Sequence, residues 1–167
     1  MSRWGITPRQ SIEAACATRG REWVIAGCVS LLHGGEAEAE LVEVLSGPQG
    51  PRYLDAPPEQ RYWLRVWGAR GLLWAPWTST AAAPGSAVSP GPADWPGAAV
   101  RSGSAASPGS AVLAGLRDEH WRVREMALKV VARHRLDAAQ PAVADLLTDE
   151  VARVRVAASR AARLLTA

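Results

Sequence analysis

The sequence predicts an all-α protein built from helical hairpins that stack on one another. Near the C-terminus, residues 111–134 align with residues 142–165 at a constant offset of 31, and nine of the aligned pairs are identical. Self-similarity with a period of about 20–50 residues is typical of proteins that stack repeated supersecondary units. In both copies the apolar residues recur three and four positions apart, which is the spacing of one face of a helix.

The N-terminal part, residues 1–74, is expected to form degenerate helical repeats. Thr7, followed by Pro8 and by Gln10 three positions after the cap, is a favourable start for a helix that ends before Gly20. Further helices are expected over residues 22–32, 36–45 and 59–74, and the proline-rich residues 46–58 are expected to form a loop. The helix over 59–74 is apolar on most sides, which places it in the middle of a stack.

Residues 75–109 differ from the rest of the chain. Of these 35 residues, 27 are Ala, Pro, Gly or Ser. Such a segment cannot bury enough apolar area to offset the entropy lost on ordering, so we expect a disordered insertion between the second and third repeat units. Trp77 and Trp95 lie inside it. They are expected to dock loosely on the helices, or alternatively to form a short motif for a partner.

Residues 110–167 are expected to form two helical hairpins. In the first hairpin, the second helix carries a stripe formed by Val123, Met126, Ala127, Val130, Val131 and His134. At the six equivalent positions of the second hairpin the residues are Val154, Ala157, Ala158, Ala161, Ala162 and Leu165. One stripe is bulky and the other is alanine-rich, so the two faces can interdigitate at close helix spacing.

The turns of these two hairpins resemble the HEAT repeat signature. The strings are Asp118-Glu119-His120-Trp121-Arg122-Val123-Arg124 and Asp149-Glu150-Val151-Ala152-Arg153-Val154-Arg155. The resemblance implies a right-handed α-α superhelix of the armadillo type, with about four hairpins and a structural ladder at Asp118, Arg124, Asp149 and Arg155. The whole chain is also similar to bacterial proteins described only as containing HEAT repeats, with residues 61–74 as a further shared block. Aligning Ala69 with Ala127 makes residues 59–74 the second helix of a degenerate repeat.

The sequence shows no arrangement of residues that is typical of a catalytic site. The sequence has no glycine-rich phosphate loop, no His-Glu-x-x-His and no Cys-x-x-Cys motif, so no catalytic residue, cofactor site or metal site is expected. Cys16 and Cys28 lie on apolar helix faces and are expected to be small buried side chains in a reducing compartment. The absence of an apolar run of about 18 residues and of a signal peptide predicts a cytoplasmic protein without membrane contact.

A basic face on the two C-terminal hairpins provides the candidate partner-binding residues Trp121, Arg122, Lys129, Arg133, Arg153 and Arg160. We expect a non-enzymatic adaptor or scaffold that recognises another protein through this surface. The second hypothesis is nucleic-acid binding through the same face, although a net charge of +3 does not imply it. A solvated face with internal ion pairs is the third, and a HEAT-like DNA glycosylase or lyase is a remote one.

Overall fold

The structure is a computed structural model and describes residues 5–77 and 106–166. Every regular element in those residues is a helix and none is a strand, so the all-α prediction is confirmed. The α-helices are α1 (Pro8–Thr18), α2 (Arg21–Leu32), α3 (Ala39–Ser46), α4 (Tyr62–Trp74), α5 (Pro108–Gly115), α6 (Trp121–His134), α7 (Gln140–Asp145) and α8 (Ala152–Leu165). Four short 3-10 helices, at Pro51–Tyr53, Pro58–Gln60, Asp137–Ala139 and Leu146–Thr148, lie in the connections.

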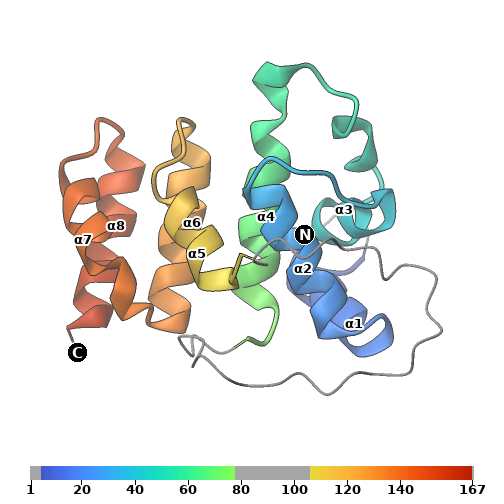
Figure 1. Cartoon of the computed structure of the whole chain (residues 1–167), viewed down its shortest axis with the longest axis horizontal. Coiled ribbons are helices and arrows are strands. Elements are labelled where there is room, and N and C mark those ends of the chain that lie inside the picture. The colour runs from blue at the N-terminus through green and yellow to red at the C-terminus, as the bar shows by residue number, and fades with distance from the viewer. Residues whose placement is uncertain (1–4, 78–105, 167) are drawn as a thin grey trace.

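The helices lie in two layers (Figure 1). One layer consists of α4, α6 and α8, in which α6 packs between the other two. The other layer contains α2, α5 and α7, which pack on α4, α6 and α8 respectively. Helices α1 and α3 contact each other beside α2 and α4, at the end opposite α8. A continuous hydrophobic core fills the space between the two layers.

Helices α1 and α2 begin close to where the sequence predicts, whereas α3 and α4 begin later. The Thr7 hydroxyl accepts a hydrogen bond from the Gln10 amide at 3.2 Å, and the Gln10 side chain accepts one from the Thr7 amide at 2.8 Å. This reciprocal capping box starts α1. Helix α3 begins three residues later than predicted, since residues 35–38 are non-helical. In this segment the Glu36 carbonyl accepts a hydrogen bond from the Ser30 hydroxyl. Helix α4 also begins three residues late, because Pro58–Gln60 forms a separate 3-10 turn.

Glycines allow α2 and α4 to approach closely. A Cβ atom on Gly68 would lie 2.8 Å from the Cys28 carbonyl oxygen, and one on Gly71 would overlap the Cys28 sulfur. Cys28 is fully buried, and this burial raises the pKa of its thiol. Both Cys16 and Cys28 are free thiols. Cys28 therefore acts as a small packing residue, as the sequence predicts.

The stripes of α6 and α8 face the core. Val123, Ala127, Val130 and Val131 of α6 are fully buried, and so are Val154, Ala158 and Ala161 of α8. The remaining stripe residues are partly buried at the edge of the core: Met126, His134, Ala157, Ala162 and Leu165. Leu128 and Arg124 of α6 are also buried, although neither belongs to the predicted stripe. Arg124 is bound to Asp149 in the turn before α8, a contact that the pattern of a single helix does not contain.

The predicted insertion over residues 75–109 is too long at both ends. Ala75 is buried, and the Trp77 indole donates a hydrogen bond to the Leu72 carbonyl at 2.7 Å. The Trp77 ring also stacks on His134, with the ring centroids 4.4 Å apart. At the other end, the Ser107 hydroxyl caps α5 by accepting a hydrogen bond from the Ser110 amide. Residues 78–105, including Trp95, lie outside the described residues.

Candidate partner-binding groove

A ladder of Arg-Asp ion pairs fixes the register of the three helices in the α4/α6/α8 layer. Arg65 of α4 binds Asp118, which precedes α6, and Arg124 of α6 binds Asp149, which precedes α8. The resemblance to the HEAT signature implied Asp118, Arg124, Asp149 and Arg155 as ladder positions. Arg155 forms no ion pair among the described residues, and Arg65 was not predicted. The predicted alignment of Ala69 with Ala127 is one residue out of register, because Arg65 occupies the place of Arg124 at an offset of 59. The pair Leu64-Arg65, compared with Val123-Arg124, is the signal that could have found it.

The Arg124–Asp149 pair is the most enclosed contact of the ladder. Arg124 Nε and Nη2 donate to the two Asp149 carboxylate oxygens at 2.8 and 3.2 Å, and the two side chains are only 11% and 6% exposed. Arg124 Nη1 donates to the carbonyl oxygens of Asp118 and Glu119. Burial by itself raises the pKa of Asp149, but the hydrogen bonds from Arg124 and from the Val151 amide outweigh it, so the pKa is lowered. The carboxylate is therefore held in its charged form.

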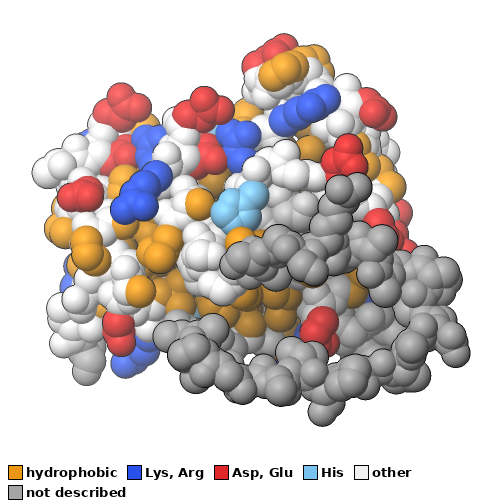
Figure 2. Space-filling view, in the orientation of Figure 1, with side chains coloured by type: hydrophobic (Ala, Val, Ile, Leu, Met, Phe, Trp, Pro, Cys, Tyr) orange, Lys and Arg blue, Asp and Glu red, His pale blue; other side chains and the backbone are white. Residues whose placement is uncertain are grey.

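The ladder aspartates stabilise the turns that lead into α6 and α8. The Asp118 and Asp149 carboxylates accept from the amides of His120 and Val151, which immediately precede α6 and α8. His120 is the N-cap of α6, where its Nδ1 atom accepts from the Arg122 amide at 3.3 Å. Its ring stacks on Tyr62 of α4 with the centroids 3.5 Å apart. Charged side chains alternate in sign along this edge, over the turns that lead into α6 and α8 (Figure 2).

Arginine and tryptophan side chains stack on one another across the α4/α6/α8 layer. The Arg122 guanidinium lies 4.5 Å from the Trp121 ring centroid and 5.1 Å from that of Trp63. Arg153 of α8 lies 5.9 Å from the Trp121 centroid. At the other end of the layer, Trp74 has Arg133 at 4.6 Å and Arg9 at 5.2 Å. The sequence identifies Trp121 as the only aromatic residue of this surface, because the approach of α4 to α6 is not visible in the repeat pattern.

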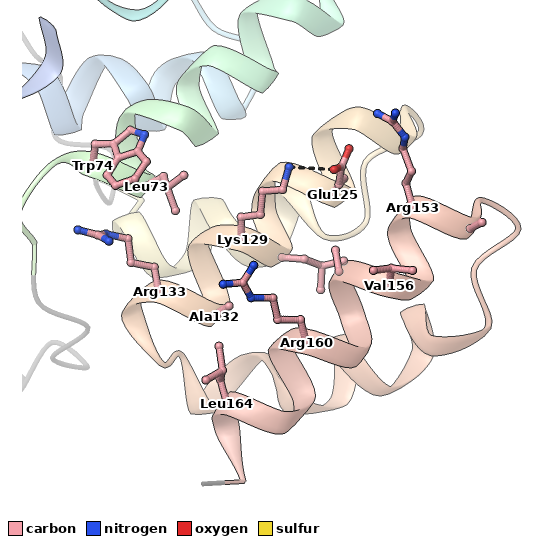
Figure 3. A pocket seen from close by; sticks show the side chains of 13 residues that line it. Leu73, Trp74, Glu125, Lys129, Ala132, Arg133, Arg153, Val156, Arg160 and Leu164 are labelled. Atoms are coloured by element: carbon pink, nitrogen blue, oxygen red, sulfur yellow. Dashed lines mark hydrogen bonds and ion pairs between the residues drawn. The ribbon is translucent and has the colours of Figure 1, made fainter. Parts of the chain in front are cut away.

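An open groove of about 730 Å³ runs between α6 and α8 and ends against the last turn of α4 (Figure 3). Its apolar lining includes Leu73, Trp74, Leu128, Ala132, Val156 and Leu164. Val156 is 70% exposed, which is the largest exposure of any large hydrophobic side chain in the described part of the chain. The charged residues that line the groove are Glu125, Lys129, Arg133, Arg153 and Arg160.

Four of the six predicted partner-binding residues therefore line one groove. These are Lys129, Arg133, Arg153 and Arg160, whereas Trp121 and Arg122 lie outside the groove at the first turn of α6. Lys129 is neutralised by Glu125, with Nζ 2.8 Å from the carboxylate. Within residues 5–77 and 106–166, the other three cations form no ion pair. The groove thus combines an apolar floor with uncompensated positive charge.

Comparison of the chain with models of protein families, with curated proteins and with solved structures gives no match in any of the three. Among the described residues, no group of three or more His, Cys, Asp and Glu side chains could hold a metal ion. None of the described helices combines the length and apolar character that a membrane span requires. We therefore infer the function from the groove itself.

Proposed function

We propose that this protein is a non-enzymatic binding module, a short HEAT-like solenoid that recognises a partner protein through its α4/α6/α8 layer. The observation that carries the proposal is the exposed Val156 in an apolar groove with cationic rims. An apolar patch rimmed by polar residues is typical of a protein interaction site. Stacked helical repeats supply such extended surfaces because each repeat adds one helix to the same face.

Nucleic-acid binding is less favoured by this surface. Proteins that bind single strands stack successive bases on free aromatic faces. Here Arg122 and Arg153 lie over Trp121, and Arg9 and Arg133 lie over Trp74. A base would have to displace these guanidinium groups. The apolar floor formed by Val156 and Leu164 also offers nothing to a phosphate backbone, whose recognition depends on charge.

The Arg-Asp ladder argues against a catalytic role for the Asp118 carboxylate. A HEAT-like glycosylase would need an acid beside the flipped base. Asp118, three residues before Trp121, is the acid that the sequence places with Trp121 and Arg122, but its side chain is 9% exposed and bound by Arg65. Its carboxylate is committed to the contact between α4 and the turn before α6. We therefore assign Asp118 a structural role.

Site-specific photocrosslinking tests the proposal. A photoreactive amino acid replaces Val156 in the full chain, and the protein is irradiated in native lysate with and without nuclease treatment. We expect one discrete protein adduct, because Val156 would lie inside the interface. Placing the same group at Gln140, an exposed position at the start of α7 in the other layer, provides the matched control and should give no such adduct.

Two outcomes would contradict the proposal. Equal labelling from Val156 and Gln140 would show that the groove does not select a partner. An adduct at Val156 that disappears on nuclease treatment, with binding that weakens steeply as salt rises, would assign the groove to nucleic acid.

A further inference from the structure

We infer that the groove between α6 and α8 binds an acidic amphipathic helix presented by the partner protein. The inference rests on the proposed function and specifies the chemistry of the partner segment. Two features of the groove support this inference. The first is the linear arrangement of its apolar residues, and the second is the placement of unpaired arginines beside them.

The floor has the shape of a helix-binding groove. Arg153, Val156, Arg160 and Leu164 of α8 follow one another three or four positions apart, so they lie on one face of that helix. Eleven residues separate the first from the last, which corresponds to about 16 Å along the helix axis. A partner helix of about three turns would cover this length. Grooves between helices commonly take the apolar face of such a helix, with anchors at every third or fourth residue.

The unpaired arginines beside the groove favour a ligand that carries carboxylates. Arg153 and Arg160 lie on the α8 side of the groove, and Lys129 and Arg133 lie on the α6 side (Figure 3). Only Lys129 has an acidic partner among the described residues. Arg133 and Arg153 lie over the rings of Trp74 and Trp121, with the guanidinium carbon 4.6 and 5.9 Å from the ring centroids. A guanidinium that lies over an aromatic ring can still donate from its edge to a carboxylate. Arginine is suited to this role because its planar fork matches a carboxylate in two-point contact.

The spacing of these cations sets the pattern of the ligand. Arg153 and Arg160 are seven residues apart, or about 10 Å, which equals two turns of helix. On the α6 side the unpaired cation is Arg133, because Glu125 already neutralises Lys129. A helix lying in the groove would meet these positions with acidic residues on both sides of its apolar stripe. A basic or uncharged amphipathic helix would leave the arginines without partners.

Other ligand classes fit the groove less well. A fatty acid or another amphiphile with a single anionic headgroup would satisfy one arginine and leave those at the opposite end unpaired. An oligonucleotide would use the cations but would place phosphates over Val156 and Leu164. Only a ligand with several carboxylates and an apolar face uses both features of the groove.

Fluorescence anisotropy with synthetic peptides tests the inference. The probe is a labelled helical peptide of about 14 residues, with leucines along one face, glutamates on both sides of that face and alanines elsewhere. One control peptide has the same composition in scrambled order, and a second has lysine in place of every glutamate. We expect the full chain to bind the probe at least about tenfold more tightly than either control.

Variants of α8 locate the binding. Arg153→Glu and Arg160→Glu should each weaken binding of the acidic probe about tenfold or more. Arg163→Glu is the matched control, because Arg163 is exposed on the same helix but does not line the groove, and it should leave binding within about twofold. The Arg153→Glu, Arg160→Glu double variant should instead prefer the lysine peptide. Such a reversal requires folded protein, so unfolding cannot imitate it.

Each outcome of these experiments is decisive. Equal binding of the acidic and scrambled peptides, or equal loss in the Arg163→Glu control, would overturn the inference. Displacement of the probe by decanoate or by a single-stranded oligonucleotide, with stronger binding than the probe itself, would replace the acidic helix with that ligand. A Val156 adduct without selective peptide binding would leave the proposed function standing and refute only the acidic helix, whereas the absence of both would refute both.

Discussion

The last two hairpins share a sequence pattern but differ in what their equivalent residues do. Arg124 and Arg155 both donate from Nη1 to the two carbonyl oxygens of their own turn. Arg124 in addition holds Asp149 of the following hairpin, whereas Arg155 is exposed and forms no ion pair in the described part of the chain. Likewise Leu116 of the first hairpin is 1% exposed, and its counterpart Leu147 is 40% exposed. The repeat motif builds the turn, and the neighbouring hairpin determines how much each residue stabilises the fold.

The sequence of α8 has adapted to this difference in surroundings. Leu128 and Val131 of α6 are buried, and at their equivalent positions α8 has Ser159 and Ala162. The Ser159 hydroxyl donates to the Arg155 carbonyl of its own helix at 2.9 Å. Ser159 and Ala162 are only partly buried, so these positions of α8 accept small or polar side chains. The α6–α8 groove lies on a different side of α8, where Val156 remains large and apolar.

The largest difference between the hairpins should come from a buried charge. Val130 and Ala161 occupy equivalent positions and are both fully buried. Val130→Asp places a carboxylate without a partner in the middle of the layer and should abolish the cooperative thermal transition seen by circular dichroism. Ala161→Asp should melt chiefly the terminal hairpin, so that a cooperative transition of reduced amplitude remains. Equal effects of the two substitutions, or a cooperative Val130→Asp protein, would contradict this account of the stack.

A matched pair of arginine truncations should sharpen the comparison. Arg124→Ala leaves the Asp149 carboxylate buried without its cation and should lower the free energy of unfolding by about 3 kcal/mol. Arg155→Ala removes only the partly solvated bonds to the carbonyl oxygens of Asp149 and Glu150 and should cost about 1 kcal/mol or less. Urea denaturation of both variants measures the difference. A smaller loss for Arg124→Ala than for Arg155→Ala would show that the ladder does not stabilise the stack.

The repeat pattern predicted much of this fold because its information is local. The helix of each repeat and the buried stripe follow from spacing within one hairpin. The ladder residues Asp118, Arg124 and Asp149 were implied by the resemblance of the two turns to the HEAT signature. The N-terminal half was harder to predict, because α3 intervenes between α2 and α4 and the pairing of those two helices depends on glycines at a close approach. Arg65 was missed because the predicted alignment of Ala69 with Ala127 is one residue away from the register in which Leu64-Arg65 matches Val123-Arg124.

The candidate site was predictable only in part. Lys129, Arg133, Arg153 and Arg160 could be identified because they recur on one helix face. Their assembly around an apolar groove could not, because the groove requires Val156 and Leu164 of α8 to face residues of α6, together with the end of α4. The stacking of Arg122 of α6 on Trp63 of α4 likewise joins two different helices. These two residues are 59 positions apart in the sequence. Contacts between units depend on helix packing, which hydrophobic periodicity does not specify.

Truncation of the paired leucines should give an intermediate effect. Leu116→Ala removes a side chain that is 1% exposed and should cost about 2 kcal/mol or more through lost burial and the cavity left behind. Leu147→Ala removes the equivalent side chain, which is 40% exposed, and should cost about 0.5 kcal/mol. The midpoint of urea denaturation reports both values. Similar midpoints would mean that Leu147 is covered in solution, for example by a second copy of the chain.

The smallest expected difference between the hairpins is in how their stability depends on pH. The residue that precedes the helix is His120 before α6 and Val151 before α8. Burial and the nearby Arg122 lower the pKa of His120 below the ordinary histidine value of about 6.5. The folded state therefore favours the neutral ring, whose Nδ1 atom accepts the capping hydrogen bond. The stability from this group is fully present above pH 6.5 or so and declines as the pH falls toward the lowered pKa, because the unfolded chain binds the proton more readily.

His120→Val copies the terminal hairpin and should remove this part of the pH dependence. At pH 8 the variant should lose about 0.5–1 kcal/mol through the missing cap and the missing stack on Tyr62. Between pH 7 and about 5 its free energy of unfolding should fall less steeply than that of the wild type. His134, whose pKa is also lowered by burial, is present in both proteins and supplies the slope that remains. Parallel pH profiles for the two proteins would show that His120 binds its proton equally well in the folded and unfolded chains.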